Sequence, residues 1–501
     1  MIARLKRRCI AWLCAAIPML TIAAGCHAQA VLTYHNTLER TGNFIVPSLT
    51  WERARSARLD SSFHPHFSGH LYAQPLYWQL PGSPSGMLIV ATEDNDVFAI
   101  DSRSGSEIWK QSLGRPVSLS SQPCGNIDPL GITGTPIIDP STQAIYLDAM
   151  TGNGSGAHHR IFALSLKSGS PLPGWPIDVA DALAARGEHF NTRFQNQRGA
   201  LAILDGRLYV PYGGHYGDCG DYRGWVIGVR LQDPHDVVSW STRGRGGGIW
   251  APGGISSDGR ALFVATGNTF GASTWSDGEA VFRLMPDLHH GERTQDFFAP
   301  ADWHALDERD ADLGGTNPLP LDLPSGGGPR ALLLALGKDG RAYLLDRNNL
   351  GGIGGSLIAE TVATRPIRTA PAAFAGADGP IVAFQGQGAH CPTPRRDNNL
   401  TVLTIRNGSP PALATTWCDA FSGEGSPIIT TTDGHSNPIV WVVGAEGDGR
   451  LHGFRGDTGE PLFSGGGPGD AMSGLRHFQS LFAAGDRLYI GADGRLYAFS
   501  F

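Results

Sequence analysis

The 501-residue sequence has few long stretches with the period of an amphipathic helix. Outside the N-terminal leader only residues 178–186 could form one, which argues against a helical protein. Outside the leader the sequence also lacks basic clusters, and its 39 Lys and Arg residues against 46 Asp and Glu residues give a formal net charge of −7. These absences argue against nucleic acid as a partner and against a surface that attracts anionic membranes.

The first thirty residues have the pattern of a signal peptide. Four basic residues within positions 4–8 precede an apolar stretch over residues 10–24, which is too short to span a membrane comfortably. Cleavage after Ala-Gln-Ala at residues 28–30 would release the chain. The alternative is a lipobox-like Ala-Ala-Gly-Cys ending at Cys26, which would anchor the chain through a lipid. We expect an exported protein, periplasmic or extracellular, with no transmembrane span in its mature chain.

A Pro or Gly step beside a small or polar residue recurs along the chain and each time opens an apolar run. Successive steps lie roughly 53 to 66 residues apart, which is typical of a propeller or repeat array. Each interval holds short apolar runs separated by Gly, Asp or Asn turns, a pattern of four-stranded antiparallel blades. Eight steps predict an all-β, eight-bladed β-propeller, with seven blades as the alternative. The steps begin at Gln74, Thr135, Arg198, Ala251, Asn317, Ala370, Ser426 and Gln479.

The blade boundaries predict how the ring closes. We expect a single propeller domain over residues 57–501, preceded by an extended arm over residues 31–56. The last interval, residues 477–501, has only three strand-like runs, and an open blade would leave a costly unpaired edge. A run near residues 57–63 is placed to supply the missing outer strand. Residues 31–50 would then pack on the outside of the ring.

Removal of the leader leaves an even number of cysteines. In an exported protein this predicts two disulfides, with free buried thiols as the alternative. Of the three possible pairings we favour Cys124–Cys219 and Cys391–Cys418, because each would join neighbouring blades.

Residues 97–109 carry the repeat that points to a family. Their sequence, Val-Phe-Ala-Ile-Asp-Ser-Arg-Ser-Gly-Ser-Glu-Ile-Trp, resembles the Ala-x-Asp-x-x-(Thr/Ser)-Gly-x-x-x-Trp repeat of the pyrroloquinoline quinone (PQQ) propeller superfamily. In that family the Trp of one blade packs on the turn Gly of the next. Weaker copies occur at residues 163–175 and 453–463. The resemblance implies the fold over nearly all of the mature chain and says little about activity.

Two segments are similar to parts of the quinoprotein alcohol and glucose dehydrogenases that contact the cofactor. Gly-Gly-Ile-Trp ends at Trp250, where those enzymes place a Trp under the planar quinone. The segment that begins Lys338-Asp-Gly-Arg resembles their motif whose basic residue contacts the quinone. The resemblance therefore implies that Trp250 is a flat apolar floor for the cofactor and that Lys338 stabilises the reduced quinone.

Three further segments resemble the metal and base positions of those enzymes. Thr-Gly-Asn ends at Asn268 and resembles a segment whose Asn helps to hold Ca²⁺. Asp310-Ala-Asp312-Leu resembles the segment that carries their catalytic carboxylate. A looser match places Asp218 near their Ca²⁺-binding Glu, with Asp221 as an alternative.

The chemistry explains why such residue types belong together. A quinone carbonyl becomes electrophilic when a hard cation with oxygen ligands polarises it, and Asp218, Asn268 and Asp312 supply such ligands. A carboxylate at Asp312 or Asp310 could take the proton of an alcohol as hydride leaves. Each residue also has a purely structural interpretation: blade packing for the Trp, and turn or solvated-loop chemistry for the others.

The sequence departs from the dehydrogenase pattern in several places. It has no adjacent Cys pair, and Arg309 stands where those enzymes have a Trp before the Asp-x-Asp segment. It has no Cys-x-x-Cys-His, so an enzyme would need a separate electron acceptor. Two functions therefore stay open: a PQQ- and Ca²⁺-dependent dehydrogenase of alcohols or sugars, or a non-catalytic propeller that binds protein or polysaccharide in the cell envelope.

Overall fold

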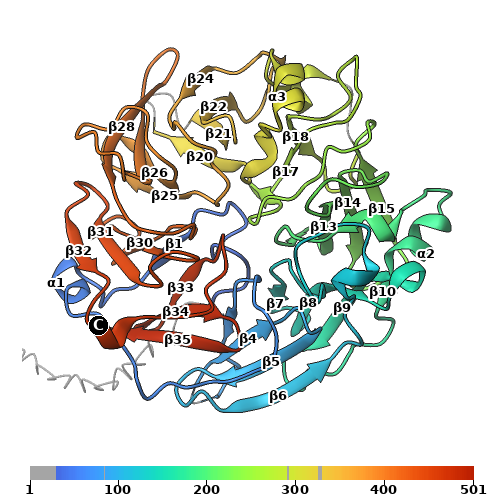
Figure 1. Cartoon of the computed structure of the whole chain (residues 1–501), viewed down its shortest axis with the longest axis horizontal. Helices are drawn as coiled ribbons and strands as arrows, with labels where there is room; N and C mark the ends of the chain where they lie inside the picture. Colours follow the sequence, from blue (N-terminus) through green and yellow to red (C-terminus); the bar gives the residue numbers. More distant parts are fainter. Residues whose placement is uncertain (1–29, 84, 290–292, 325–329) are drawn as a thin grey trace, which may run out of the picture.

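Eight antiparallel sheets form a ring around a central axis (Figure 1). The structure, a computed structural model, describes residues 30–501 apart from 84, 290–292 and 325–329. The prediction of eight four-stranded blades is confirmed, and the seven-bladed alternative is wrong. The expected signal peptide, with Cys26, lies outside the described residues except for its last position. Among the described residues, no helix is long and apolar enough to cross a membrane.

The first four blades follow the chain in order, and the last strand of blade 4 comes from further along. Blade 1 contains β3 (Leu76–Trp78), β4 (Met87–Ala91), β5 (Asp96–Asp101) and β6 (Glu107–Ser112); blade 2 contains β7 (Ile137–Asp139), β8 (Ala144–Thr151), β9 (His158–Ser165) and β10 (Ile177–Asp178); blade 3 contains β11 (Gln195–Asn196), β12 (Ala202–Leu204), β13 (Arg207–Gly214), β14 (Trp225–Arg230) and β15 (Val237–Ser241); blade 4 contains β16 (Ser256–Ser257), β17 (Leu262–Thr266), β18 (Ala280–Leu284), β19 (Phe297–Ala299) and β23 (Gly352–Ile353).

The last four blades complete the ring, and two of them take a strand from the N-terminal arm. Blade 5 contains β20 (Leu319–Leu323), β21 (Arg330–Leu336), β22 (Arg341–Asp346) and β24 (Ile358–Thr361); blade 6 contains β25 (Ala372–Gly376), β26 (Gly379–Gln385), β27 (Leu400–Arg406) and β28 (Ala412–Asp419); blade 7 contains β1 (Asn43–Ile45), β29 (Ile428–Thr431), β30 (Ile439–Val443), β31 (Leu451–Arg455) and β32 (Pro461–Ser464); blade 8 contains β2 (Arg58–Leu59), β33 (Leu481–Ala484), β34 (Arg487–Ala492) and β35 (Arg495–Ser500). The helices are α1 (Trp51–Ala54), α2 (Val179–Ala184), which lies within the expected helical stretch, and α3 (Trp303–Arg309).

The hydrophobic core lies between neighbouring blades. Ile89 in blade 1 packs in one cluster with Ile145 and Leu147 in blade 2, and a similar cluster joins blades 5 and 6. Each sheet is therefore covered on both faces, which explains why the middle strands are continuous apolar runs rather than alternating ones. All five residues of β4 are buried.

The docking of Trp on Gly that the repeat predicts occurs at two blade junctions. The indole of Trp109 in blade 1 covers Gly169 in blade 2, where an added Cβ would lie 2.6 Å from the ring, and its Nε1 donates to Leu166 O at 3.1 Å. Trp417 in blade 6 covers Gly459 in blade 7 in the same way. Both glycines have positive φ, 73° and 77°, so each serves the turn as well as the contact.

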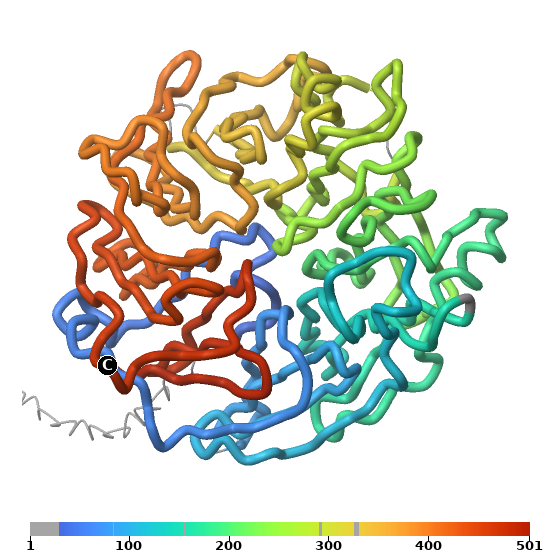
Figure 2. The backbone as a smooth tube through the Cα atoms, viewed as in Figure 1, coloured from blue at the N-terminus to red at the C-terminus, as the bar shows by residue number. Residues whose placement is uncertain are grey.

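The N-terminal arm closes the ring, but by a path that differs from the expected one. β2 pairs antiparallel with β35 and supplies the outer strand of blade 8, as predicted. The expectation that residues 31–50 pack on the outside is wrong. β1 pairs in parallel with β29 and so adds a strand to the inner edge of blade 7, next to the axis. Figures 1 and 2 show the blue arm crossing the middle of the ring. Its apolar side chains, Phe44 and Leu49 among them, are buried in one cluster with residues of blades 7 and 8, which shields them from water.

Arg40 fixes the arm inside the ring. It is fully buried and donates to three backbone carbonyls of blades 3 and 4, at 2.7 Å to Leu201, 3.1 Å to Gly253 and 3.0 Å to Ile255. It also donates to Tyr34 O within the arm at 3.0 Å. Burial lowers the pKa of Arg40 to about 9. The guanidinium therefore satisfies carbonyls that the first strands leave free at the axis.

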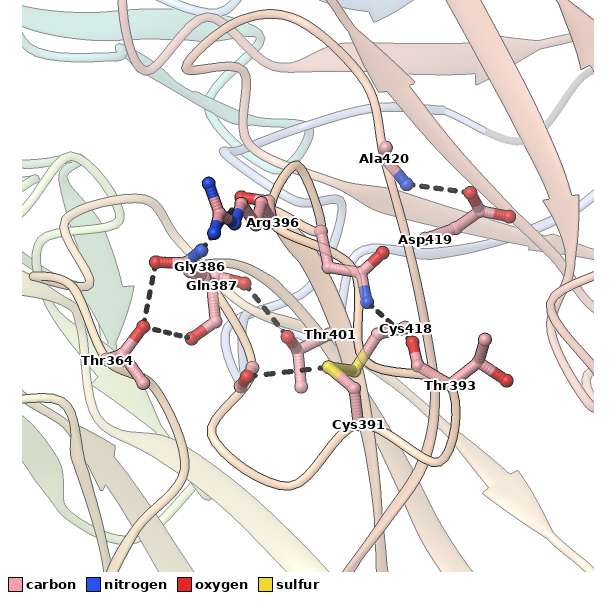
Figure 3. The surroundings of a disulfide bond; sticks show 12 residues. Thr364, Gly386, Gln387, Cys391, Thr393, Arg396, Thr401, Cys418, Asp419 and Ala420 are labelled. Atoms are coloured by element: carbon pink, nitrogen blue, oxygen red, sulfur yellow. Dashed lines mark hydrogen bonds between the residues drawn. A yellow bond between two sulfur atoms is a disulfide. The ribbon is translucent and has the colours of Figure 1, made fainter.

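Both favoured disulfides are present. Cys124–Cys219 joins the segment after blade 1 to the β13–β14 loop of blade 3. Cys391–Cys418 does not join neighbouring blades as expected, because it links the β26–β27 loop to β28 within blade 6. Figure 3 shows this bond beside Thr401, whose hydroxyl donates to Gly386 O at 2.8 Å. The long β26–β27 loop explains the difference, since it folds back over its own blade.

Candidate active site

A cavity of about 710 Å³ brings together the candidate residues of blades 3, 4 and 5. They come from the β13–β14 loop, from the segments before β16 and after β17, from the end of α3 and from the β21–β22 turn. Because these loops lie at one end of adjacent blades, positions more than a hundred residues apart face the same space. The candidates that line it are Asp218, Trp250, Asn268, Asp310, Asp312 and Lys338.

Asp312 lies at the centre of the hydrogen bonds in this group. Its side chain is buried, with 4% of the residue exposed. Its Oδ2 accepts from Trp250 Nε1 at 3.0 Å and from Lys338 Nζ at 3.1 Å. Its Oδ1 accepts from the backbone N–H of Asn268 at 3.3 Å. Its carbonyl also accepts from the backbone N–H of Lys338 at 2.8 Å. Contacts from two blades therefore fix the carboxylate in one orientation.

Lys338 holds the two candidate carboxylates together. Its Nζ lies 2.9 Å from Asp310 Oδ1, and it lies 5.7 Å from the centroid of the Trp250 ring. The Asp310 side chain is 66% exposed, whereas that of Asp312 is 5% exposed. Of the two, Asp312 is thus the carboxylate shielded from water, and Asp310 is a second, solvated partner of the ammonium.

The charges around Asp312 oppose one another. Burial raises the pKa of Asp312, the Lys338 ammonium lowers it, and the like charges of Asp310 and Asp218 raise it again. Burial alone would lower the pKa of Lys338, but Asp312 and Asp310 together hold it above its ordinary value. The site therefore contains an ammonium that stays charged and a carboxylate with a raised affinity for protons.

Glu279 is a fully buried neighbour of Asp312 that the sequence analysis did not find. Its Oε2 accepts from the backbone N–H of Leu313 at 2.6 Å. Among the described residues, its Oε1 has no hydrogen-bond partner. Burial, and then the charge of Asp312, raises the pKa of Glu279 well above its ordinary range. The signal in the sequence is slight: a carboxylate in Gly278-Glu279-Ala280, at the start of the apolar strand β18.

Asp218 lies on the wall formed by blade 3. Its Oδ1 accepts from the hydroxyl of Tyr222 at 2.7 Å. The next residue, Cys219, forms the disulfide that fixes this loop. Asp221, the alternative to Asp218, is exposed and is not among the residues that line the cavity. Between the two, the geometry favours Asp218.

The cavity has the features that a flat quinone needs. Trp250 provides a half-buried indole, and Lys338 places a positive charge beside it. The volume is in the range of cavities that enclose small-molecule cofactors.

For a hard cation the side chains are of the right kind. Asp218 and Asp312 carry carboxylates and Asn268 carries an amide oxygen. Among the described residues, however, no three His, Cys, Asp or Glu side chains gather as a metal-binding group. The amide of Asn268 would therefore have to complete the ligand set.

Comparison with solved structures identifies the fold. No family model matches the sequence, and no curated protein matches it either. Solved structures do match. Quinohemoprotein alcohol dehydrogenase from Comamonas testosteroni is 16% identical, with a TM-score of 0.62, covering 94% of this chain and 80% of that one. Quinohemoprotein alcohol dehydrogenase ADHIIG from Pseudomonas putida HK5 is 14% identical, with a TM-score of 0.66 and the same coverage of each chain. A europium-containing methanol dehydrogenase is 14% identical, with a TM-score of 0.65, covering 94% of this chain and 98% of that one. At such identities the likeness establishes the fold: the chain has the eight-bladed propeller fold of the quinoprotein alcohol dehydrogenases.

Proposed function

We propose that the protein is an exported PQQ- and Ca²⁺-dependent dehydrogenase that oxidises alcohols or sugars. The observation that carries the proposal is the buried Asp312, held by the Trp250 indole and the Lys338 ammonium at the wall of the large cavity. A non-catalytic propeller has no need of such convergence. The two disulfides favour an oxidising compartment, periplasmic or extracellular.

We assign a role to each of the candidate residues that line the cavity. PQQ would lie against Trp250, and Ca²⁺ would be held by Asp218, Asn268 and Asp312; when bound, the quinone supplies the two-electron acceptor and the cation supplies a Lewis acid. Asp312 accepts the proton of the substrate hydroxyl, because burial raises its pKa and with it the affinity of the carboxylate for a proton. Lys338 orients this carboxylate. Asp310 is the alternative base. A separate protein or small molecule takes the electrons onward.

The alternative, a scaffold that binds protein or polysaccharide, would be favoured by an apolar patch on the surface. In the part of the chain that the structure describes, the large exposed apolar side chains are instead spread over blades 1, 3, 4 and 7, at Ile45, Ile108, Tyr216, Met285 and Ile353. Scattered exposure of this kind is ordinary for a soluble protein. It gives no support to the scaffold.

Reconstitution tests the proposal. Purified protein is titrated with PQQ in the presence of Ca²⁺ and followed by absorbance, and turnover is then measured with an artificial electron acceptor. We expect saturable binding, and we expect Asp312→Asn to lower kcat by roughly 100-fold or more while PQQ still binds. Asp221→Asn, outside the cavity, is the matched control. Absence of saturable PQQ binding would refute the proposal, and full activity in Asp312→Asn would show that Asp312 is not the base.

A further inference from the structure

Arg198 lines the same cavity but belongs to none of the contacts described above. It lies at the start of blade 3, between β11 and β12, and reaches the start of blade 8. There its Nη2 lies 3.2 Å from His477 Nε2, and its guanidinium lies 5.1 Å from the centroid of the Phe478 ring. Blades 3 and 8 are separated by blades 1 and 2, so the side chain extends across this part of the ring.

The guanidinium of Arg198 has few partners. Among the described residues it forms one hydrogen bond, to His477, and no ion pair. Burial lowers the pKa of Arg198, and the nearby Tyr72 and Glu93 oppose this shift. Its remaining N–H donors are available to whatever enters the cavity. Since no carboxylate pairs directly with this partly buried guanidinium among the described residues, a ligand carboxylate would add a favourable ion pair.

His477 and Glu446 hold the guanidinium in place. His477 Nδ1 lies 2.7 Å from Glu446 Oε1, and the backbone N–H of His477 donates to the same oxygen at 3.1 Å. This assigns the proton to Nδ1 and leaves Nε2 to accept from Arg198. The carboxylate of Glu446 therefore positions Arg198 through the imidazole without pairing with it.

A second cation lies in the cavity wall near the rim. Arg368 lines the same cavity, and its Nη2 lies 3.3 Å from Glu424 Oε1, with both side chains more than 40% exposed. An exposed pair of this kind is weak and easily exchanged. The negative groups at Asp310 and Asp312 belong to blades 4 and 5, and these basic groups belong to blades 3 and 6. The two arginines thus come from blades other than those of Asp310 and Asp312, and the carboxylates of Asp218 and Glu424 line the same cavity.

We propose that Arg198 is a specificity-determining residue that binds a carboxylate of the substrate, so that the preferred substrate is an acidic sugar or another hydroxy acid. The planar guanidinium matches a carboxylate in a bidentate pair. The substrate's carboxylate binds Arg198 while a hydroxyl of the same molecule faces Asp312. That this substrate is oxidised rests on the proposed function, whereas its binding does not.

Equilibrium binding without quinone tests the subsite directly. Calorimetric titration compares D-glucuronate with D-glucose, which differ by the carboxylate. We expect the protein to bind glucuronate roughly 10- to 100-fold more tightly, and Arg198→Gln to remove this preference. Arg198→Lys keeps the positive charge but loses the paired N–H donors of the guanidinium, so it should retain part of the preference for glucuronate. Arg365→Gln, at an exposed arginine that is not among the residues lining the cavity, is the control. Equal affinity for the two sugars, or a preference that survives in Arg198→Gln, overturns the proposal.

PQQ also carries carboxylates, so a second titration separates the two ligands. Unchanged PQQ affinity in Arg198→Gln, together with a KM that rises for glucuronate and not for glucose, supports the substrate subsite. A loss of PQQ affinity with an unchanged glucuronate preference overturns it. If the wild-type protein binds no PQQ but still prefers glucuronate, the proposed redox function fails and the carboxylate subsite stands.

Discussion

Glu93 makes the stability of the protein depend on pH. It follows β4, is fully buried, and accepts one hydrogen bond, from Gly131 N to its Oε2 at 2.7 Å. Among the described residues its Oε1 has no partner. Burial raises the pKa of Glu93 from 4.5 to about 7, although the Gly131 bond opposes the shift. The folded state therefore keeps the proton over a range in which the unfolded chain has lost it.

The sign and size of the effect follow from this difference. The contribution of Glu93 to the free energy of unfolding is greatest below about pH 4.5 and is lost as pH rises through about 7. A pKa shift of this size lowers the free energy of unfolding at pH 8 by about 3 kcal/mol relative to its value below pH 4.5. Glu93→Gln stays neutral and keeps an acceptor for Gly131. It should therefore match the wild type near pH 4 and exceed its stability by about 3 kcal/mol at pH 8.

Urea unfolding at pH 4, 6 and 8, followed by tryptophan fluorescence, measures the difference. The gain of Glu93→Gln should grow between pH 4.5 and 7 and stay constant above about pH 8. Glu107→Gln, on the exposed outer strand of the same blade, should leave the profile of the wild type unchanged. Parallel profiles for Glu93→Gln and the wild type over the whole range would refute the reasoning.

Two further predictions concern the ring itself. Arg40→Met removes the guanidinium that donates to the three carbonyls of blades 3 and 4 and should cost at least about 3 kcal/mol, with faster hydrogen exchange in β1. An unchanged urea midpoint with unchanged exchange would contradict it. Opening Cys124–Cys219 by a double Ser substitution should cost about 1 kcal/mol more than opening Cys391–Cys418, because the sequence separations are 95 and 27; the reverse order of urea midpoints would show that loop length does not dominate.

Much of the fold could be predicted because the information is local and repeated. The spacing of the Pro and Gly steps specified eight blades, and the pattern at residues 97–109 predicted that Trp109 would dock on a turn glycine. The path of the arm could not be predicted in this way. Val31 and Phe44 indicate that the arm is buried, but any apolar surface would satisfy them. Only the assembled ring shows that the free edge of β29 faces the axis.

The candidate site residues likewise fall into those that a local sequence pattern predicts and those that it does not. Trp250, Asp312 and Lys338 could be found because each lies in a short segment that resembles a known motif. Glu279 and Arg198 could not, because nothing adjacent to them in the sequence indicates a role. What distinguishes them is a buried charge with few hydrogen-bond partners, which depends on residues brought close by distant blades. Such features are properties of the folded chain and have no local pattern.

The path of the N-terminal arm imposes an order on assembly. β1 and β2 are made early, but Asn43 pairs with Ile429 and Arg58 pairs with Ser500, so both strands wait for nearly the whole polypeptide. Blade 8 is also completed late, because its outer strand β2 pairs with β35 at the end of the chain. We therefore expect newly made chains to pass through an incompletely closed ring. This ring closes when β1 pairs with blade 7 and β2 pairs with blade 8.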